Sequence, residues 1–229
     1  TRRRRQRQMF IRDSAGTVNE AYEELINSGL EIFGEYIKKI DHTLIGLSNS
    51  KFEEITHVIS HPQALQQCSK FLQDSKLRIT PVFDTAGSVF EILETKDINT
   101  AAIAGEHFKN DERFKILKEN ISNHQENFTR FLLIGNEKLE SNKENNKYSS
   151  VLISDDKPGS LLKALNIFSD LNINLTKLES RPILGRPWEY KFYIDYELQN
   201  VKTQTELIDG IKKVSKEFII LGHYPKANP

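Results

Sequence analysis

The chain has 229 residues, of which 38% are hydrophobic and 28% charged, and this length and composition predict one or two domains with a sizeable core. No apolar run approaches the roughly 18 residues of a membrane helix, no apolar signal segment follows the basic start, and a single cysteine excludes an internal disulfide. The single cysteine and the lack of such apolar segments predict a cytoplasmic protein without membrane partners, and the balance of 32 basic and 32 acidic residues predicts no nucleic-acid partner.

The first twelve residues carry a strong local charge. They contain six arginines and no acidic residue, which leaves a net charge of −6 for the rest of the chain. One interpretation is an RNA-binding or targeting segment. We favour a disordered start, because the rest of the chain is acidic and no aromatic platform accompanies the arginines. Residues 1–12 are therefore placed outside the predicted domains.

From residue 13 to residue 136, strand-like and helix-like stretches alternate, which predicts an α/β domain. A helix is expected over 19–30 with Gly29 as its stop, a second over 61–72, and a third from a Thr85 cap to about residue 94. Extended segments are expected at 32–40, 56–59, 77–83, 100–104, 114–121 and 129–134.

The single cysteine, Cys68, lies on the apolar face of the second expected helix. A cysteine in this position is either a core residue or a nucleophile, and we favour the core because the neighbouring apolar residues share its face. One cysteine excludes a cysteine-cluster metal site, and the sequence has no phosphate-binding loop, no dinucleotide fingerprint and no Gly-x-Ser-x-Gly elbow. We therefore expect neither a metal site nor a cofactor.

Residues 137–148 are polar, carry charges of both signs and lack apolar periodicity, so they predict a linker. Residues 149–229 then follow the order βαββαβ in about 80 residues, which is the ferredoxin-like arrangement. The expected strands are 150–154, 175–180, 190–197 and 218–224, and the expected helices run from Pro158 to residue 171 and over 203–216.

Two short segments could carry chemistry. Thr129 and Arg130 stand at the entry to an apolar strand, where the hydroxyl could relay a proton and the guanidinium could pair with a carboxylate; the alternative is a cap and a surface charge. The stretch 159–162 opens a helix and 179–182 ends a strand. Free backbone N–H groups at the helix start would suit a carboxylate, and the alternative is simple turn chemistry.

Several separated motifs in this order resemble the prephenate dehydratase family with a C-terminal ACT regulatory domain. The resemblance is strongest to the dehydratase and regulatory parts of bifunctional chorismate mutase–prephenate dehydratases, and it covers about residues 13–225. It rests on SHPQALQQCSKFL at 60–72, on Thr-Arg-Phe within NFTRFLLIG at 127–135, on ESRPILGRPWEYKFYID at 179–195, and on the segment 16–46.

The resemblance implies a two-lobed, periplasmic-binding-protein-like α/β dehydratase domain followed by a ferredoxin-like ACT domain. It implies cofactor-free decarboxylative dehydration of prephenate to phenylpyruvate in L-phenylalanine biosynthesis. Thr129 would be the catalytic hydroxyl, acting through positioning and hydrogen bonding in a desolvated cleft. The substrate-binding residues would be Ser60, Gln63, Thr85 and Arg130, although each could equally be a capping or structural residue.

The resemblance also implies feedback inhibition by L-phenylalanine bound to the ACT domain, with a homodimer or tetramer because such sites lie between paired domains. The regulatory residues would be Gly159, Ser160, Leu161, Leu162, Glu179, Ser180, Arg181 and Pro182.

One departure from the family pattern concerns the first lobe. The Glu-Asn-Ser stretch of the family would fall near 11–13 and does not match, and no Gly-Pro-Glu-Gly-Thr loop precedes it. We therefore expect an incomplete dehydratase domain with weak or absent catalysis by this chain alone. The alternative function is a catalytically impaired remnant that acts only as a phenylalanine-binding module.

Overall fold

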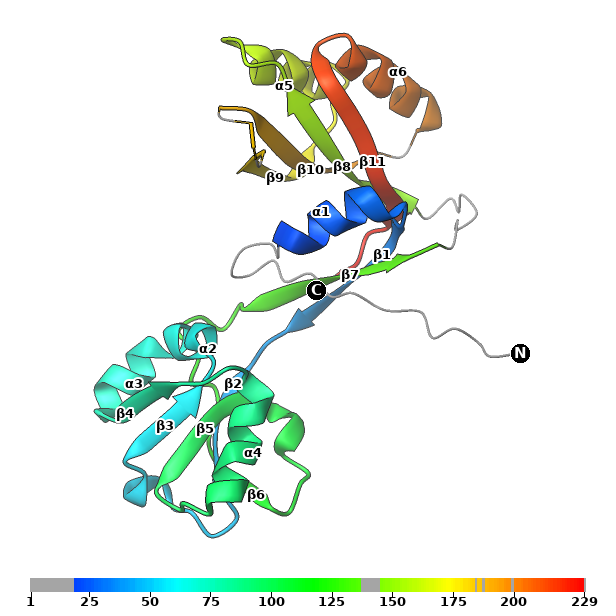
Figure 1. The fold of residues 1–229 in the computed structure, drawn as a ribbon. Helices are drawn as coiled ribbons and strands as arrows, with labels where there is room; N and C mark the ends of the chain where they lie inside the picture. The colour runs from blue at the N-terminus through cyan, green and yellow to red at the C-terminus, as the bar shows by residue number, and fades with distance from the viewer. Residues whose placement is uncertain (1–18, 137–144, 184, 187, 199, 229) are drawn as a thin grey trace. The chain divides into compact units, whose positions relative to one another are not determined.

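The computed structural model describes residues 19–136, 145–183, 185, 186, 188–198 and 200–228 (Figure 1). Backbone contacts divide them into two units. Residues 38–129 form the central unit, and the described residues up to Ile37 together with those from Arg130 onward form the terminal unit. The predictions for 1–12 and for 137–144 of the linker lie outside the described residues.

The central unit is built on a five-stranded sheet in the order β4-β3-β5-β2-β6. Strand β3 pairs in parallel with β4 and β5, whereas β2 is antiparallel to β5 and β6. Strand β2 was not predicted from the sequence. The strands are β2 (His42–Leu47), β3 (His57–Ser60), β4 (Arg78–Pro81), β5 (Thr100–Gly105) and β6 (Phe114–Lys118).

Helices cover both faces of this sheet. Successive strand residues point to opposite sides, so apolar side chains on each face pack against helices. Val58 packs with the α2 and α3 side, whereas Ile59 packs with the α4 side. The predicted helix over 61–72 is broken at Cys68, whose φ of −113° is not helical. The elements are α2 (Pro62–Gln67), α3 (Ser69–Ser75), α4 (Thr85–Thr95) and the 3₁₀ turns η1 (Phe52–Glu54) and η2 (Glu106–Phe108).

The terminal unit contains a six-stranded sheet in the order β7-β1-β11-β8-β10-β9. Its last four strands are antiparallel neighbours, which confirms the predicted ferredoxin-like arrangement. The strands are β1 (Glu31–Lys39), β7 (Phe128–Gly135), β8 (Asn145–Ser154), β9 (Leu175–Pro182), β10 (Tyr190–Glu197) and β11 (Ser215–Pro225). Strand β8 begins at Asn145, so it takes up the end of the predicted linker.

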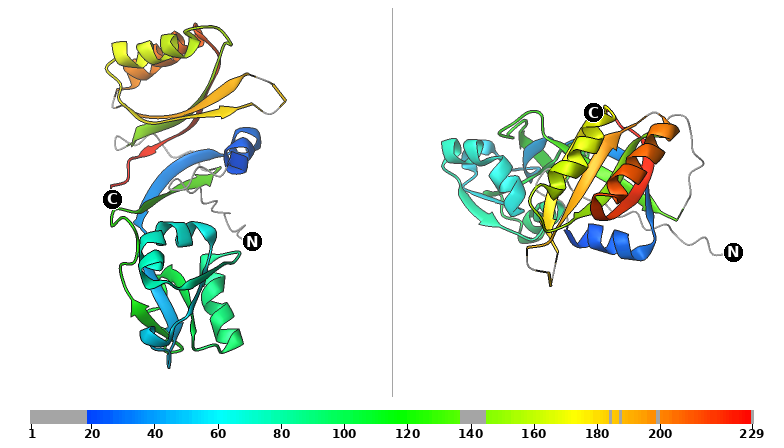
Figure 2. Two further views of the ribbon diagram at one scale, coloured as in Figure 1. Left: turned by 90° about the vertical axis from the view of Figure 1, so that its left-hand side faces the viewer. Right: turned by 90° about the horizontal axis from the view of Figure 1, so that it is seen from above.

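Both faces of this sheet are also covered. Helices α5 (Ser160–Asp170) and α6 (Val201–Lys212) pack on one face, with Phe168 and Leu207 in that core (Figure 2). Helix α1 (Asn19–Ser28) packs Tyr22 and Leu25 on the other face. Strand β1 joins β11 in parallel and thereby extends the ferredoxin-like sheet.

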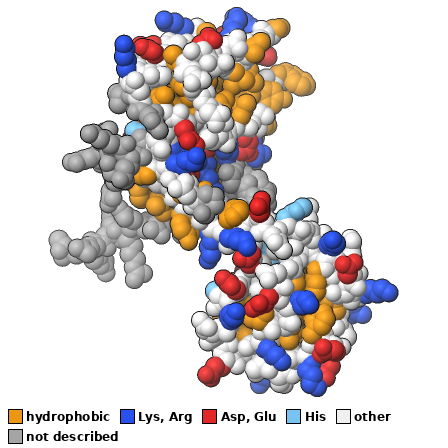
Figure 3. All heavy atoms as spheres, turned by 180° about the vertical axis from the view of Figure 1, so that it is seen from behind, with side chains coloured by type: hydrophobic (Ala, Val, Ile, Leu, Met, Phe, Trp, Pro, Cys, Tyr) orange, Lys and Arg blue, Asp and Glu red, His pale blue; other side chains and the backbone are white. Residues whose placement is uncertain are grey.

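Local capping explains where two helices begin. The N-cap of α4 is Asp84, whose carboxylate accepts a hydrogen bond from the Gly87 N–H, so Thr85 is the first helical residue rather than the predicted cap. Helix α5 begins after Gly159 and not at Pro158, because Gly159 takes a left-handed conformation with φ of 80°. Positive and negative side chains are interspersed on the face of the described residues seen in Figure 3.

Candidate functional site

Three of the predicted substrate-binding residues meet at one edge of the central sheet. Ser60 ends β3 and pairs with Pro81, which ends the parallel strand β4. Strand β3 continues into α2 on one face, where Gln63 lies, and β4 continues into α4 on the other face, where Thr85 lies. In open α/β sheets, ligands bind at the carboxyl ends of strands whose connections diverge in this way.

The three residues differ in how much they offer to a ligand. Ser60 is fully buried, and its Oγ donates a hydrogen bond of 2.6 Å to the carbonyl oxygen of Ile103 in β5. Gln63 and Thr85 are half-buried, each in the first turn of its helix. Ser60 is therefore engaged inside the sheet, whereas Gln63 and Thr85 retain surface at the edge.

Thr129 lies at the start of β7 and is the last residue in sequence of the central unit. Its side chain is buried, with 3% of the residue exposed. The catalytic role assigned to Thr129 from the sequence stays a prediction.

Arg130, the next residue, lies in a buried cluster of charges. Its Nε donates to Glu35 Oε2 at 2.5 Å, its Nη1 donates to Asp195 Oδ2 at 2.5 Å, and its Nη2 donates to the Tyr224 hydroxyl at 2.7 Å. The Arg130 side chain is only 12% exposed. The interpretation of Arg130 as a surface charge is therefore wrong, and its guanidinium binds two carboxylates of the protein itself.

Further donors complete the cluster around the two carboxylates. Lys147 Nζ donates to both oxygens of Glu35 at 2.9 and 3.0 Å, and the backbone N–H of Ala227 donates to Glu35 Oε1 at 3.0 Å. Ser149 Oγ donates to Asp195 Oδ1 at 2.5 Å. We call Arg130, Glu35, Asp195, Lys147, Ser149 and Tyr224 the Arg130 cluster.

Opposite charges control ionisation in the Arg130 cluster. Burial by itself would raise the pKa of Glu35, but the charge of Arg130 and the hydrogen bond from Lys147 lower it below its ordinary value. Burial, together with the charge of Asp195, raises the pKa of Tyr224 well above its ordinary value. Glu35 is therefore ionised and Tyr224 is neutral near pH 7.

The terminal unit contains a hollow of about 240 Å³ at the start of α5. It includes the four residues predicted there, Gly159 to Leu162. Gly159 has no side chain to cap the helix, so the first-turn N–H groups of Leu161 and Leu162 face no side-chain acceptor from the N-cap. The full lining is Ser154, Asp155, Asp156, Lys157, Gly159, Ser160, Leu161, Leu162, Trp188, Glu189 and Tyr190.

Apolar and acidic groups lie side by side in the hollow. Leu162 is 61% exposed and Trp188 is 79% exposed, so both offer apolar surface. Asp155, Asp156 and Glu189 supply carboxylates. A hydrogen bond from Lys216, 3.1 Å from Glu189 Oε1, keeps the pKa of Glu189 below its ordinary value.

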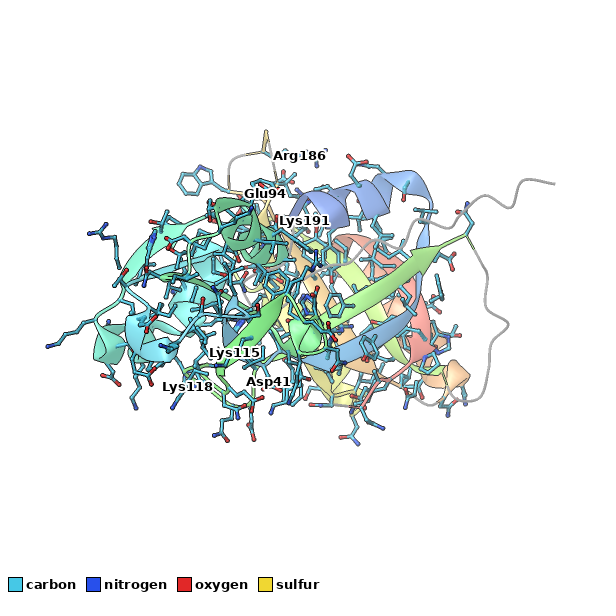
Figure 4. The ribbon with its side chains drawn as sticks, turned by 90° about the horizontal axis from the view of Figure 1, so that it is seen from below. Asp41, Glu94, Lys115, Lys118, Arg186 and Lys191 are labelled. Atoms are coloured by element: carbon cyan, nitrogen blue, oxygen red, sulfur yellow. The ribbon has the colours of Figure 1, made fainter. Side chains whose placement is uncertain are left out.

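The second predicted regulatory stretch, Glu179–Pro182, lies in β9, at one edge of the sheet, and does not line the hollow. It adjoins the lining where Pro182 pairs with Tyr190. Within β9, Glu179 forms ion pairs with Lys177 and Arg181. On the next strand, Lys191 points toward α1, where its ammonium binds Glu23 (Figure 4).

Sequence reasoning missed Trp188, Glu189 and Tyr190 of the hollow. They follow two prolines and a glycine in the sequence, which are turn-forming residues but do not indicate which side chains the turn places together. Trp188 has a φ of 67°, an uncommon conformation for a bulky residue. Such strain is found at functional sites and is not readable from composition.

Two kinds of feature are absent from the part of the chain that the structure describes. It holds no group of three or more histidine, cysteine, aspartate or glutamate residues arranged to bind a metal ion. None of its helices is long and apolar enough to cross a membrane.

The model of a protein family described as prephenate dehydratase matches residues 13–139. This chain belongs to the prephenate dehydratase family. A prephenate dehydratase of Methanocaldococcus jannaschii is 38% identical over 198 residues, which cover 86% of this chain and 71% of that protein. This chain spans 54–58% of the length of several other relatives, among them a bifunctional chorismate mutase/prephenate dehydratase of Enterobacter agglomerans and an arogenate dehydratase of Petunia hybrida.

Solved structures share the fold of this prephenate dehydratase family member. A structure described as prephenate dehydratase in complex with L-Phe, from Arthrobacter aurescens, has a TM-score of 0.77 and 25% identity and covers 86% of this chain and 67% of its own. A structure described as GqqA, a quorum quenching acylase, has a TM-score of 0.82 and 25% identity and covers 95% of this chain and 81% of its own. The predicted α/β fold class is confirmed.

Proposed function

We propose that this chain takes part in the conversion of prephenate to phenylpyruvate and binds L-phenylalanine in the hollow at the start of α5. The hollow carries the proposal, because it combines an uncapped helix start, carboxylates and exposed apolar side chains within about 240 Å³. That volume is below the ~300–1,000 Å³ typical of sites for larger ligands. These features suit a free amino acid with an apolar side chain.

Each part of L-phenylalanine has a counterpart in the lining. The ligand carboxylate would accept hydrogen bonds from the first-turn N–H groups of Leu161 and Leu162, aided by the helix dipole. Its ammonium would bind Asp155 or Asp156, and its ring would lie against Leu162 and Trp188. The relative from Arthrobacter aurescens, crystallised with L-Phe, supports this choice of ligand.

The dehydratase reaction needs positioning more than it needs a cofactor. The ring carboxylate of prephenate leaves as carbon dioxide, its bonding electrons enter the ring, and the ring hydroxyl leaves as water after accepting one proton. Formation of the aromatic ring drives both cleavages. We propose that Gln63 and Thr85, at the edge of the central sheet, bind the substrate and that Thr129 donates a hydrogen bond to the departing hydroxyl.

A second candidate function is a phenylalanine sensor without turnover. The burial of two hydroxyls favours it, because Ser60 is engaged with Ile103 and Thr129 is 3% exposed. In either case we propose a homodimer or tetramer. Strand β9, an edge strand that carries Glu179–Pro182, is the natural place for a second copy, and sedimentation velocity would measure the state.

Two measurements on the purified chain test these proposals. Formation of phenylpyruvate from prephenate, followed by its absorbance, is expected for the enzyme, and its absence at high protein concentration leaves the sensor. Calorimetry with L-phenylalanine is expected to show saturable binding, and D-phenylalanine is expected to bind more weakly because it cannot place all three groups at once. Equal, non-saturating signals for both enantiomers would overturn the regulatory proposal.

A matched pair of glycine variants locates the binding site. Gly159 and Gly29 both have positive φ, 80° and 68°, and a Cβ at either position would meet no atom within 4 Å. Gly159→Ala and Gly29→Ala therefore carry a similar backbone penalty, but only the first alters the hollow. Phenylalanine binding is expected to weaken in Gly159→Ala and to persist in Gly29→Ala.

A further inference from the structure

We propose that Arg130 is a positioning residue, not a substrate ligand, and that the Arg130 cluster transmits phenylalanine occupancy from the hollow to the strand that carries Thr129. This inference rests on the proposed function, since it assigns a regulatory route between the two proposed sites. Nothing in the Thr-Arg-Phe motif itself indicates this role, because the partners of Arg130 lie 65 to 95 residues away in the chain.

The Arg130 cluster joins five neighbouring strands of one sheet. Arg130 comes from β7 and Glu35 from β1. Strand β11 supplies Tyr224, β8 supplies Lys147 and Ser149, and β10 supplies Asp195. These strands are consecutive in the order β7-β1-β11-β8-β10. A movement of β8 or β10 therefore changes the position of charged groups that bind β7 and β1.

The guanidinium of Arg130 has little capacity left for a substrate carboxylate. Each of its three nitrogens donates to a protein acceptor, two of which are carboxylates. A dianionic substrate would have to displace Glu35 or Asp195, and it would leave a buried carboxylate without its partner. Holding β7 in place is the role that these contacts perform.

Two adjacent strands connect the cluster with the hollow. Strand β8 runs from Ser149 in the cluster to Ser154 in the lining, and β10 runs from Tyr190 in the lining to Asp195 in the cluster. Asp195 pairs directly with Ser149. The span is about 17 Å at ~3.3 Å per residue. A ligand that shifts the start of α5 therefore also shifts β8 and β10, the strands that carry Ser149 and Asp195.

Thr129 receives this effect through the chain itself. It precedes Arg130 directly, and its side chain projects from the opposite face of β7 because successive strand residues alternate. The hydrogen bonds of Arg130 to Glu35, Asp195 and Tyr224 thereby fix the direction in which the Thr129 hydroxyl points. Weakening or strengthening these hydrogen bonds is expected to change the rate of the chemical step and not the affinity for the substrate.

A tyrosine pair gives the first test. Tyr224→Phe removes the hydroxyl that bonds Arg130 and Ser149, whereas Tyr196→Phe removes an equally buried hydroxyl that bonds Gln204 outside the cluster. Hydrogen–deuterium exchange of residues 128–135 is measured with and without L-phenylalanine. In the wild-type chain and in Tyr196→Phe, phenylalanine is expected to change the exchange rate of these residues at least about threefold. In Tyr224→Phe this change is expected to be lost, while calorimetry still detects phenylalanine binding.

Each outcome of the exchange experiment decides between the proposals. If the wild-type chain binds no phenylalanine, the proposed regulatory function and this inference are both overturned. If it binds phenylalanine with no change over 128–135, or if Tyr224→Phe and Tyr196→Phe behave alike, only the inference is overturned. The exchange readout needs no turnover, so it is equally decisive for the enzyme and for the sensor.

Steady-state kinetics give the second test wherever the wild-type chain turns over prephenate. Arg130→Gln and Asp195→Asn are expected to lower kcat by a similar factor, about tenfold or more, with KM within about threefold of the wild-type value. Asp195 is a carboxylate and cannot bind an anionic substrate directly, so a shared effect on kcat identifies positioning. A large increase in KM for Arg130→Gln that Asp195→Asn does not share would assign Arg130 to the substrate.

Discussion

Ser60 and Ile103 are joined across the parallel strands β3 and β5, because Ser60 Oγ donates a hydrogen bond of 2.6 Å to the carbonyl oxygen of Ile103. The family motif at 60–63 suggested a substrate-binding hydroxyl at this position. The structure instead engages that hydroxyl inside the sheet, at the edge where Gln63 and Thr85 retain exposed surface. Removal of the Ser60 hydroxyl is therefore expected to lower the stability of the fold more than it affects substrate binding.

Ser60→Ala is expected to lower the free energy of unfolding by about 1–3 kcal/mol, because it removes a buried donor from a carbonyl acceptor. Chemical denaturation measures the change. Ser48→Ala, at an exposed position, is the control and is expected to lie within about 0.5 kcal/mol of wild type. If Ser60→Ala leaves stability unchanged but impairs substrate binding, the Ser60 hydroxyl is a substrate-binding group after all.

Gly222 permits the close pairing of β11 with β1. A Cβ at this position would lie 2.1 Å from the carbonyl oxygen of Ile32, its partner in the register, so the strands would have to separate. Gly222→Ala is expected to destabilise the chain by about 3 kcal/mol. Gly210→Ala in α6 is the contrasting variant, since its Cβ meets a side-chain methyl of Ile167 at 3.0 Å and not backbone, and helix propensity favours alanine by about 1 kcal/mol.

Thermal and chemical unfolding of the two glycine variants are expected to shift in different directions. Gly222→Ala is expected to unfold earlier than wild type, and Gly210→Ala at the same point or slightly later. Equal behaviour of the two would mean that β1 does not pair with β11 at Ile32.

Trp188 and Leu162 supply the apolar surface of the hollow, and Trp188 is 79% exposed. Trp188→Ala is expected to weaken L-phenylalanine binding about tenfold, equivalent to ~1.4 kcal/mol, because the ring of the ligand loses an aromatic neighbour. Stability should change by less than about 0.5 kcal/mol, since little of the side chain is buried. Phe83→Ala, at a residue 95% exposed in the central unit, is the control for calorimetry and should bind the ligand like wild type.

The ferredoxin-like order was predictable because its signals are local. Apolar periodicity and turn residues place each strand between residues that are near in sequence, although the helix expected from Pro158 begins only after Gly159. The strand β2 was missed, although all six of its residues are buried. It has no alternation of polar and apolar residues, and this alternation is the strand signal that a sequence offers most directly.

The Arg130 cluster was not predictable, because its contacts join residues far apart in the chain. Glu35 is 95 residues from Arg130 and 112 residues from Lys147. Each of these residues reads locally as an ordinary surface charge. The strand order β7-β1-β11-β8 brings their side chains together, and neither periodicity nor composition carries information about that order.

Glu35 makes stability depend on acid pH. Its pKa in the folded chain lies below the ordinary value of about 4.3, so its ion pairs stabilise the fold fully above that value and lose their contribution as the pH falls through the folded pKa. Glu35→Gln is expected to cost about 3 kcal/mol at pH 7, because Arg130 and Lys147 lose a buried counter-charge. The difference from wild type is expected to shrink below about pH 4.

Denaturation curves between pH 3 and pH 7 measure this difference directly. Glu119→Gln breaks an ion pair with Lys109 in which both side chains are more than half exposed, and it is expected to cost less than about 1 kcal/mol. A constant gap between Glu35→Gln and wild type across this range would show that Glu35 contributes by packing and not by charge.

Cys68 lies at the junction of α2 and α3, fully buried against the central sheet. Burial raises the pKa of its thiol to about 12, so almost no thiolate is present at pH 8 and both access and nucleophilicity are low. A thiol reagent is therefore expected to leave the native chain unlabelled for hours and to label it once per chain in denaturant. Ser48→Cys supplies a matched exposed thiol, which should react within minutes. Rapid labelling of the native wild-type chain would mean that α2 and α3 open readily, and it would remove Cys68 from the core.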